Sequence, residues 1–239
     1  MNIYWHVPDR DLMPTGIFQV GDTMEMMDTS NPPLVYIVDD DSSVRAALAD
    51  LLATVGLVVK TFTSASELLE ACRSVGRKAS ERPNCLILDV RMPGISGLEA
   101  QDHLAKLNVS VPVIFMTGHG DVAMTVKAMK AGAHDFLSKP FRDEDMLDAV
   151  RSALADDKIE REKERIYRDL AERYASLTPH EQKLLAMVTS GMMNKQIASE
   201  MNLSEITIKV HRGQLMRKMR ATTLVELVKM EARLKKIDD

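Results

Sequence analysis

Acidic, hydroxyl and basic side chains come directly after the short apolar runs in the first two thirds of this sequence. Asp39 and Asp40 follow the first run, Asp89 the third, Thr117 the fourth and Lys139 the fifth. Clustered carboxylates resist burial unless a cation compensates them, and their hard oxygen atoms suit Mg²⁺. A carboxylate beside such a cation can act as a nucleophile that forms an acyl phosphate. A hydroxyl and an ammonium group nearby would bind the added phosphoryl charge.

The elements that must position these side chains alternate between strand-like and helix-like patterns. The strand-like runs span 34–38, 57–62, 85–88, 111–116 and 134–138, and the helix-like segments span 42–55, 65–75, 97–107, 121–131 and 143–155. This alternation predicts an α/β domain, a doubly wound five-stranded parallel sheet with helices on both faces. Ligands bind such sheets at the carboxyl ends of the strands, so the side chains named above should gather at one edge.

Each of these residues taken alone has an ordinary explanation. An Asp that ends a strand is usually a turn residue or a helix cap, and we expect Asp41 to cap the helix that begins near Ser42. Ser64 and Glu67 likewise predict a capping box for the helix at 65–75. What indicates a phosphoryl site is the occurrence of the whole set at successive strand ends.

Four motifs in this region resemble the receiver domain of bacterial response regulators, which has a flavodoxin-like fold. They are VDDD at 38–41, LDVRMPGISG at 88–97, MTGHGD at 116–121 and FLSKPF at 136–141. The resemblance implies that Asp89 is the phosphoacceptor. It also implies a Mg²⁺ cofactor, with ligands from Asp39, Asp40, Asp89 and the backbone carbonyl of Arg91.

The same resemblance assigns the residues that respond to phosphorylation. Thr117 and Phe136 would form the switch pair, and Lys139 would contact the phosphoryl group. Phe136 stands where many receivers have Tyr, so its ring can bury inward but offers no hydroxyl partner. The Lys139–Pro140 bond is a candidate cis peptide by this resemblance, although base rates alone favour trans.

The last segment of the chain, 176–239, has a helical pattern without strands and predicts a small all-α domain. It carries 11 basic and 7 acidic residues, whereas the whole chain has a net charge of −4. The residues TPHE at 178–181 have the cap, proline and glutamate of a helix start. A short helix at 194–201 and a basic helix at 205–219 follow, which predicts a helix-turn-helix. In the basic helix, periodicity predicts partial burial for Ile206, Val210 and Leu215.

Three motifs in this segment resemble the LuxR-type DNA-binding domain: LTPHE at 177–181, GMMNKQIA at 191–198 and SEITIKVHRGQLMRKM at 204–219. Together with the receiver motifs they make the chain resemble the NarL/FixJ class of response regulators. Gly213 departs from relatives that carry a contacting side chain there, and it would permit a close backbone approach. The resemblance implies DNA contacts from Thr207, Lys209, Val210, Arg212 and Lys218.

The sequence therefore divides into four parts. We expect a flexible extension at 1–33, a receiver domain at 34–155, a helical linker at 156–175 and a LuxR-type helix-turn-helix domain at 176–239. Met27 is a candidate start of the chain. The linker is strongly charged, and its widely spaced apolar residues favour a solvated connecting helix, with a dimerising seam as the alternative. Those apolar residues are Ile159, Ile166, Leu170 and Tyr174.

Composition limits the class of protein further. No run approaches the roughly 20 apolar residues of a membrane-spanning helix. The two cysteines are too few for a disulfide framework, and Cys85 lies in an apolar run typical of a buried thiol. These observations predict a cytoplasmic protein without a membrane partner.

We therefore expect a transcriptional regulator rather than an enzyme. By the resemblance, a partner histidine kinase phosphorylates Asp89, which promotes homodimerisation and binding to double-stranded promoter DNA, with RNA polymerase a possible further partner. The alternative is a constitutively dimeric regulator whose receiver does not need phosphorylation. A phosphatase with an Asp nucleophile and Mg²⁺ is disfavoured, because Arg91 replaces the second Asp of that motif and residues 176–239 would stay unexplained.

Overall fold

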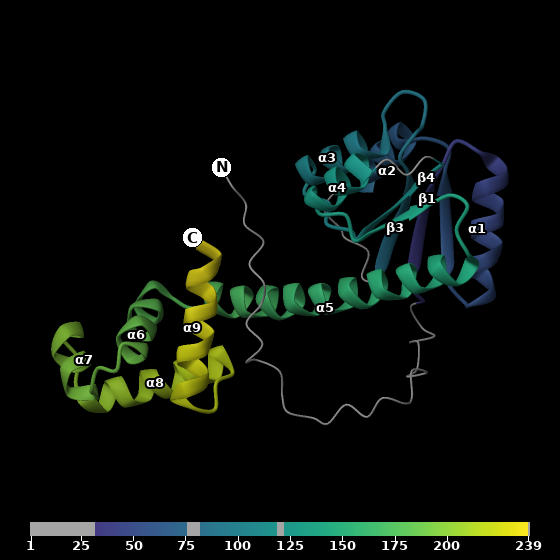
Figure 1. The fold of residues 1–239 in the computed structure, drawn as a ribbon. Coiled ribbons are helices and arrows are strands. Elements are labelled where there is room, and N and C mark those ends of the chain that lie inside the picture. The colour runs from purple at the N-terminus through teal and green to yellow at the C-terminus, as the bar shows by residue number, and fades with distance from the viewer. Residues whose placement is uncertain (1–31, 76–81, 119–121, 239) are drawn as a thin grey trace.

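The computed structural model describes residues 32–75, 82–118 and 122–238, and Figure 1 shows them as two domains at opposite ends of one long helix. The expected extension at 1–33 and the start at Met27 therefore lie almost wholly outside the described residues. The strands are β1 (Leu34–Val38), β2 (Val58–Phe62), β3 (Asn84–Asp89), β4 (Val113–Thr117) and β5 (Asp135–Ser138). The helices are α1 (Ser42–Thr54), α2 (Ala65–Val75), α3 (Gly97–Lys106), α4 (Val122–Lys130), α5 (Asp143–Ala175), α6 (Pro179–Thr189), α7 (Asn194–Met201), α8 (Glu205–Met219) and α9 (Leu224–Asp238).

The N-terminal domain is the predicted doubly wound sheet. Its five strands are all parallel in the order β2-β1-β3-β4-β5. β3 and β4 are buried along their whole length, which explains why they read as unbroken apolar runs without alternation. Both carry their polar residue at the carboxyl end, where Asp89 closes β3 and Thr117 closes β4.

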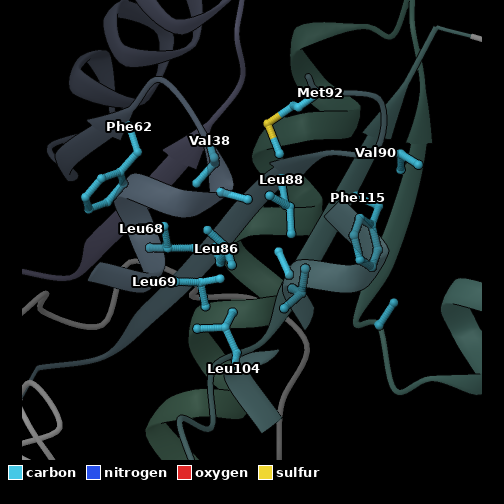
Figure 2. Close-up of a cluster of buried hydrophobic side chains, with 14 of the residues drawn as sticks. Val38, Phe62, Leu68, Leu69, Leu86, Leu88, Val90, Met92, Leu104 and Phe115 are labelled. Atoms are coloured by element: carbon cyan, nitrogen blue, oxygen red, sulfur yellow. The ribbon is translucent and has the colours of Figure 1, made fainter. Parts of the chain in front are cut away.

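Two apolar clusters hold the helices on the two faces of this sheet. One lies under α2 and α3 and is built around Leu86, Leu88 and Phe115, as Figure 2 shows. The other lies under α1 and α5 and is built around Ile37 and Ile114. Cys85 belongs to this second cluster, so the predicted buried thiol is confirmed, and burial raises the pKa of that thiol to about 12.

Helix caps account for several of the element boundaries. The carboxylate of Asp41 accepts from the backbone N–H of Ser43 at 2.7 Å, which confirms its predicted role as the cap of α1. The cap of α2 is shared differently from the prediction. The Ser64 hydroxyl accepts from the Glu67 N–H at 3.3 Å, but the Glu67 carboxylate binds the N–H of Thr63 rather than that of Ser64.

α5 is one uninterrupted helix of 33 residues that belongs to both domains. Its first half packs on the sheet through Met146, Val150 and other buried residues. Its last turns bury Leu170 in the core of the C-terminal domain. The charged middle stays in solvent, because Ile159 and Ile166 are 50% and 42% exposed.

A buried carboxylate fixes the direction in which α5 leaves the sheet. Asp157 is only 5% exposed and its Oδ2 accepts from the backbone N–H of Asn84 at 2.7 Å. Arg161, one turn further along α5, donates to the same oxygen. This contact joins α5 to the start of β3. It also gives the Asn84 N–H the acceptor that a buried backbone N–H requires.

The C-terminal domain consists of α6 to α9 around a separate apolar core. Leu184, Leu185, Ile197, Ile208 and Leu215 are almost completely buried in it. The predicted start of α6 is confirmed, because Thr178 and Glu181 form a reciprocal capping box with a proline in the first turn. None of the helices in the described part of the chain is long and apolar enough to cross a membrane.

Candidate functional site

Two buried carboxylates and one ammonium group meet at the carboxyl edge of the sheet. Lys139 Nζ lies 2.7 Å from Asp39 Oδ2 and 2.8 Å from Asp89 Oδ1. Asp39 and Asp89 are 1% and 5% exposed, although they are separated by 50 residues in the sequence. The structure thus brings together three of the residues that the sequence placed at this edge.

Backbone groups orient the two carboxylates around the lysine. The second oxygen of Asp89 accepts from the Arg91 N–H at 2.8 Å, and the second oxygen of Asp39 accepts from the Asp41 N–H at 2.9 Å. A guanidinium nitrogen of Arg45 donates to the carbonyl oxygen of Asp39 at 2.7 Å. Each carboxylate therefore keeps one oxygen for Lys139 and has the other held by its own loop.

Gly97 supports Asp89 from behind, and the sequence analysis did not single it out. A Cβ at this position would lie 2.4 Å from the carbonyl oxygen of Asp89. The Gly97 N–H also donates to the Val90 carbonyl at 3.1 Å. Only glycine lets α3 begin this close to the end of β3. The close approach of the two backbones becomes visible only in the structure, because Gly97 has no side chain that could take part in chemistry.

Burial and pairing shift the pKa values of the two groups that meet most closely. Burial raises the pKa of Asp89, while the hydrogen bond and charge of Lys139 lower it and the charge of Asp39 raises it. The pKa of Lys139 is also raised, because its bonds to Asp39 and Asp89 outweigh the effect of burial. The site therefore concentrates negative charge that a single ammonium group must compensate.

Of the remaining predicted pocket residues, Asp40 is exposed at the end of β1 and Thr117 is fully buried at the end of β4. Phe136 is half-buried and packs against the cluster under α2 and α3. The Lys139 N–H donates to the Thr117 carbonyl at 2.7 Å, and the Lys139–Pro140 bond is cis as the resemblance implied. The His-Gly-Asp part of the MTGHGD motif, at 119–121, lies outside the described residues.

The donor set of this pocket suits a hard cation. Its available atoms are carboxylate and carbonyl oxygens, and Mg²⁺ typically binds through one or two carboxylates and keeps several waters. In the residues that the structure describes, no group of three or more His, Cys, Asp or Glu side chains could hold a metal by itself. The residues therefore fit an ion that completes its shell with water and phosphate oxygens, and not a closed structural metal site.

The second candidate site is the pair α7 and α8. Gly191, at φ +85°, ends the turn after α6, and Asn202, at φ +54°, ends α7. The Ser204 hydroxyl accepts from the Thr207 N–H at 3.1 Å and caps α8. These boundaries give two short helices joined by a three-residue connection, the geometry of a helix-turn-helix.

The exposed face of α8 differs from the sequence prediction. Leu215 is buried as predicted, but Ile206 is 79% exposed and Val210 is 55% exposed, so the prediction of partial burial for these two was wrong. Ile208 fills the core instead. The apolar residues of α8 are too many for one face, and the periodicity could not tell which of them turn inward.

Two of the predicted DNA contacts take part in bonds within the domain. Arg212 Nη1 donates to Asn194 Oδ1 at 2.8 Å, which joins α8 to α7. Lys218 Nζ lies 2.6 Å from Glu181 Oε2, which joins α8 to α6. Lys209 is exposed, whereas Thr207 is half-buried with its hydroxyl 2.8 Å from that of Ser204. Neither Asn194 nor Glu181 was expected in these roles.

Comparison with known proteins identifies the family of each of the two domains. Residues 35–151 match the response regulator receiver domain, and residues 175–231 match the luxR family of bacterial regulatory proteins. Nodulation protein W of Bradyrhizobium diazoefficiens is 47% identical over 87% of this chain and 88% of its own length. The transcriptional regulatory protein FixJ of Azorhizobium caulinodans is 42% identical over 82% of this chain and 90% of its own. The solved structure of the response regulator StyR is 42% identical, with a TM-score of 0.75, and covers 84% of this chain and 99% of that one.

The fold, the acidic pocket and the helix-turn-helix define a response regulator, a member of the two-component systems. Within that family the chain belongs to the NarL/FixJ class, in which a receiver precedes a LuxR-type DNA-binding domain.

Proposed function

We propose that this protein is a phosphorylation-dependent transcriptional regulator in which Asp89 accepts a phosphoryl group from a partner histidine kinase. The observation that carries the proposal is the pocket in which Lys139 bridges Asp39 and Asp89 at 2.7 and 2.8 Å. Two buried carboxylates beside one cation are costly for folding. An arrangement of that kind is retained more readily for chemistry than for stability.

In the proposed step an oxygen of the Asp89 carboxylate forms a bond to phosphorus as the phosphorus–nitrogen bond of the kinase phosphohistidine breaks. Asp39, Asp40, Asp89 and the Arg91 carbonyl would hold Mg²⁺, which supplies charge neutralisation for the incoming phosphate oxygens. The Asp89 oxygen that now binds Lys139 has room to exchange partners, because Lys139 is 25% exposed along its side chain. Lys139 then pairs with the phosphoryl oxygens, which carry more negative charge than the carboxylate.

The structural response to phosphorylation of Asp89 would involve β4 and β5. Thr117 ends β4 in a fully buried position, and Phe136 lies on the neighbouring strand, half-buried and paired with Phe115 in the sheet register. We propose that the Thr117 hydroxyl turns to the phosphoryl group and that the Phe136 ring fills the space released. This movement would remodel the surface of α4, β5 and α5, favour a homodimer, and so increase affinity for two DNA half-sites.

For the DNA end we propose contacts from Thr207, Lys209, Val210, Arg212 and Lys218 on promoter DNA. Support comes from the placement of all five on α8, the second helix of the helix-turn-helix. Arg212 and Lys218 would keep or exchange their present bonds within the domain. We further propose the domain limits given above, a cytoplasmic location, and RNA polymerase as a partner at the promoter.

The test is the intact mass of the full chain after incubation with Mg²⁺ and acetyl phosphate, followed by DNA binding of the same samples. We expect one phosphoryl adduct, none in Asp89→Asn, and tighter binding of the modified protein to DNA. The matched control is Asp41→Asn, because Asp41 also follows a strand of this sheet, β1, but caps α1. Equal DNA binding with and without the adduct would contradict phosphorylation dependence and favour a regulator that is active without phosphorylation.

A further inference from the structure

The exposed stripe of α8 is more apolar than a surface that only contacts phosphate needs to be. Ile206, Val210 and Gly213 follow one another at spacings of four and three residues, so they share one face of the helix. Ile206 and Val210 are 79% and 55% exposed. The buried residues Ile208, Leu215 and Met219 lie on the opposite side.

Folding gives no reason for these residues at these positions. Isoleucine and valine are poorer helix formers than leucine or alanine, and glycine is poorer still. An exposed aliphatic side chain contributes little to the core, and a Cβ added at Gly213 would meet nothing within 4 Å. Internal packing therefore does not require a glycine there, and a role outside the domain accounts for all three.

The surroundings of the stripe indicate which partner covers it. Lys209 and Arg217 are exposed on the same side of α8, and the segment 176–239 has four more basic than acidic residues. A surface that is apolar along its centre and basic at its margins matches the major groove, whose floor carries base edges and whose walls carry phosphates. Ile206 also lies in the first turn of α8, and residues of that turn reach base edges in helix-turn-helix proteins.

We infer that Ile206 and Val210 contact the 5-methyl groups of thymines in the major groove, and that Gly213 lets the backbone of α8 approach closely enough for this contact. The inference rests on the proposed function and adds the chemical class of base that the helix selects. The thymine methyl is the apolar group that unmodified base pairs present in that groove. Residues four apart in a helix are about 6 Å apart along its axis. The two thymine pairs should therefore lie close together, within the same few base pairs of one half-site.

The experiment uses the full chain, with and without acetyl phosphate, and a pool of random double-stranded DNA from which bound sequences are selected. In the selected sequence each thymine is then replaced singly by deoxyuridine, which removes only the methyl group. We expect about a fourfold loss of affinity at each contacted thymine, the effect of one buried carbon. In Ile206→Ala and Val210→Ala the loss at the matching thymine should disappear. Val58→Ala serves as the matched control, because Val58 is a partly exposed valine on β2.

The outcomes separate the inference from the proposed function. If a sequence is selected and every deoxyuridine version binds as well as the thymine version, the methyl contact is refuted and DNA binding stands. If no sequence is enriched under either condition, sequence-specific DNA binding fails and the inference fails with it. Circular dichroism of the variants checks the fold, which the substitutions should leave intact because both side chains are exposed.

Discussion

Replacement of Lys139 by methionine should destabilise the receiver domain in the absence of divalent cations. The lysine is the cation that both Asp39 and Asp89 contact, at 2.7 and 2.8 Å. Methionine keeps much of the side-chain length but removes the charge. Two carboxylates, 1% and 8% exposed along their side chains, would then face each other with no ammonium group between them.

The size of the effect follows from burial. Removal of one partner of a buried ion pair costs about 3–5 kcal/mol, because the remaining charge stays desolvated. Lys139 is itself 25% exposed, and water reaching the site lowers the cost, so we expect a loss of about 2–3 kcal/mol. Addition of Mg²⁺ should restore much of this stability, because a bound cation compensates the same carboxylates and binds only the folded domain.

Hydrogen exchange measured by mass spectrometry on peptides from β3 and β4 reports this domain separately from the other. A loss of 2–3 kcal/mol corresponds to roughly 30- to 150-fold faster exchange of the most protected amides. The matched control is Lys163→Met, because Lys163 pairs with Glu160 at 3.1 Å on the exposed part of α5 and should matter little. Equal exchange rates in the two variants, or no rescue by Mg²⁺, would refute the reasoning that buried charge determines the effect.

Three further predictions concern other contacts. Asp157→Ala should destabilise the receiver by about 1–3 kcal/mol in urea denaturation, because a buried N–H at the start of β3 loses its acceptor; Asp156→Ala, at an exposed neighbour, should cost little. The bond from Lys218 holds the pKa of Glu181 below its ordinary value of 4.5, so the C-terminal domain should lose stability as pH falls below that value. Glu181→Gln should remove this part of the pH dependence of the domain's melting temperature. Gly213→Ala should stabilise the same domain by about 0.5–1 kcal/mol while weakening DNA binding, and a destabilised variant would show that the helix needs glycine for its own fold.

The strand and helix pattern was largely predictable because burial determines it. The short, unbroken apolar runs of β3 and β4, bounded by turn residues, indicate strands covered on both faces. The caps Asp41, Ser204 and Thr178 mark helix starts by local chemistry. Such signals depend on neighbours within a few residues, so a single sequence carries them.

Contacts between segments far apart in the chain were harder to predict from the sequence. The bonds that Arg212 donates to Asn194 and the Asn84 N–H donates to Asp157 join residues 18 and 73 positions apart, and neither accepting side chain is unusual in type. The inward turn of Ile208, with Ile206 left outside, depends on the docking of α8 against α6 and α7 and not on its own pattern. The continuity of α5 was missed for a related reason, because most of its charged middle is exposed and the apolar packing that marks a helix lies at its two ends.

The unbroken α5 also sets the angular relation between the two domains. An α-helix turns by about 100° and rises by about 1.5 Å per residue. A single residue inserted in its exposed middle would therefore rotate the helix-turn-helix about the helix axis by more than a quarter turn. Seven inserted residues would return it to within about 20° of its original facing, at roughly 10 Å greater distance. The number of residues between Asp157, which contacts β3, and the core residue Leu170 thus determines which way the helix-turn-helix faces relative to the sheet. Changes in that number should preserve the facing only when they add or remove nearly whole turns.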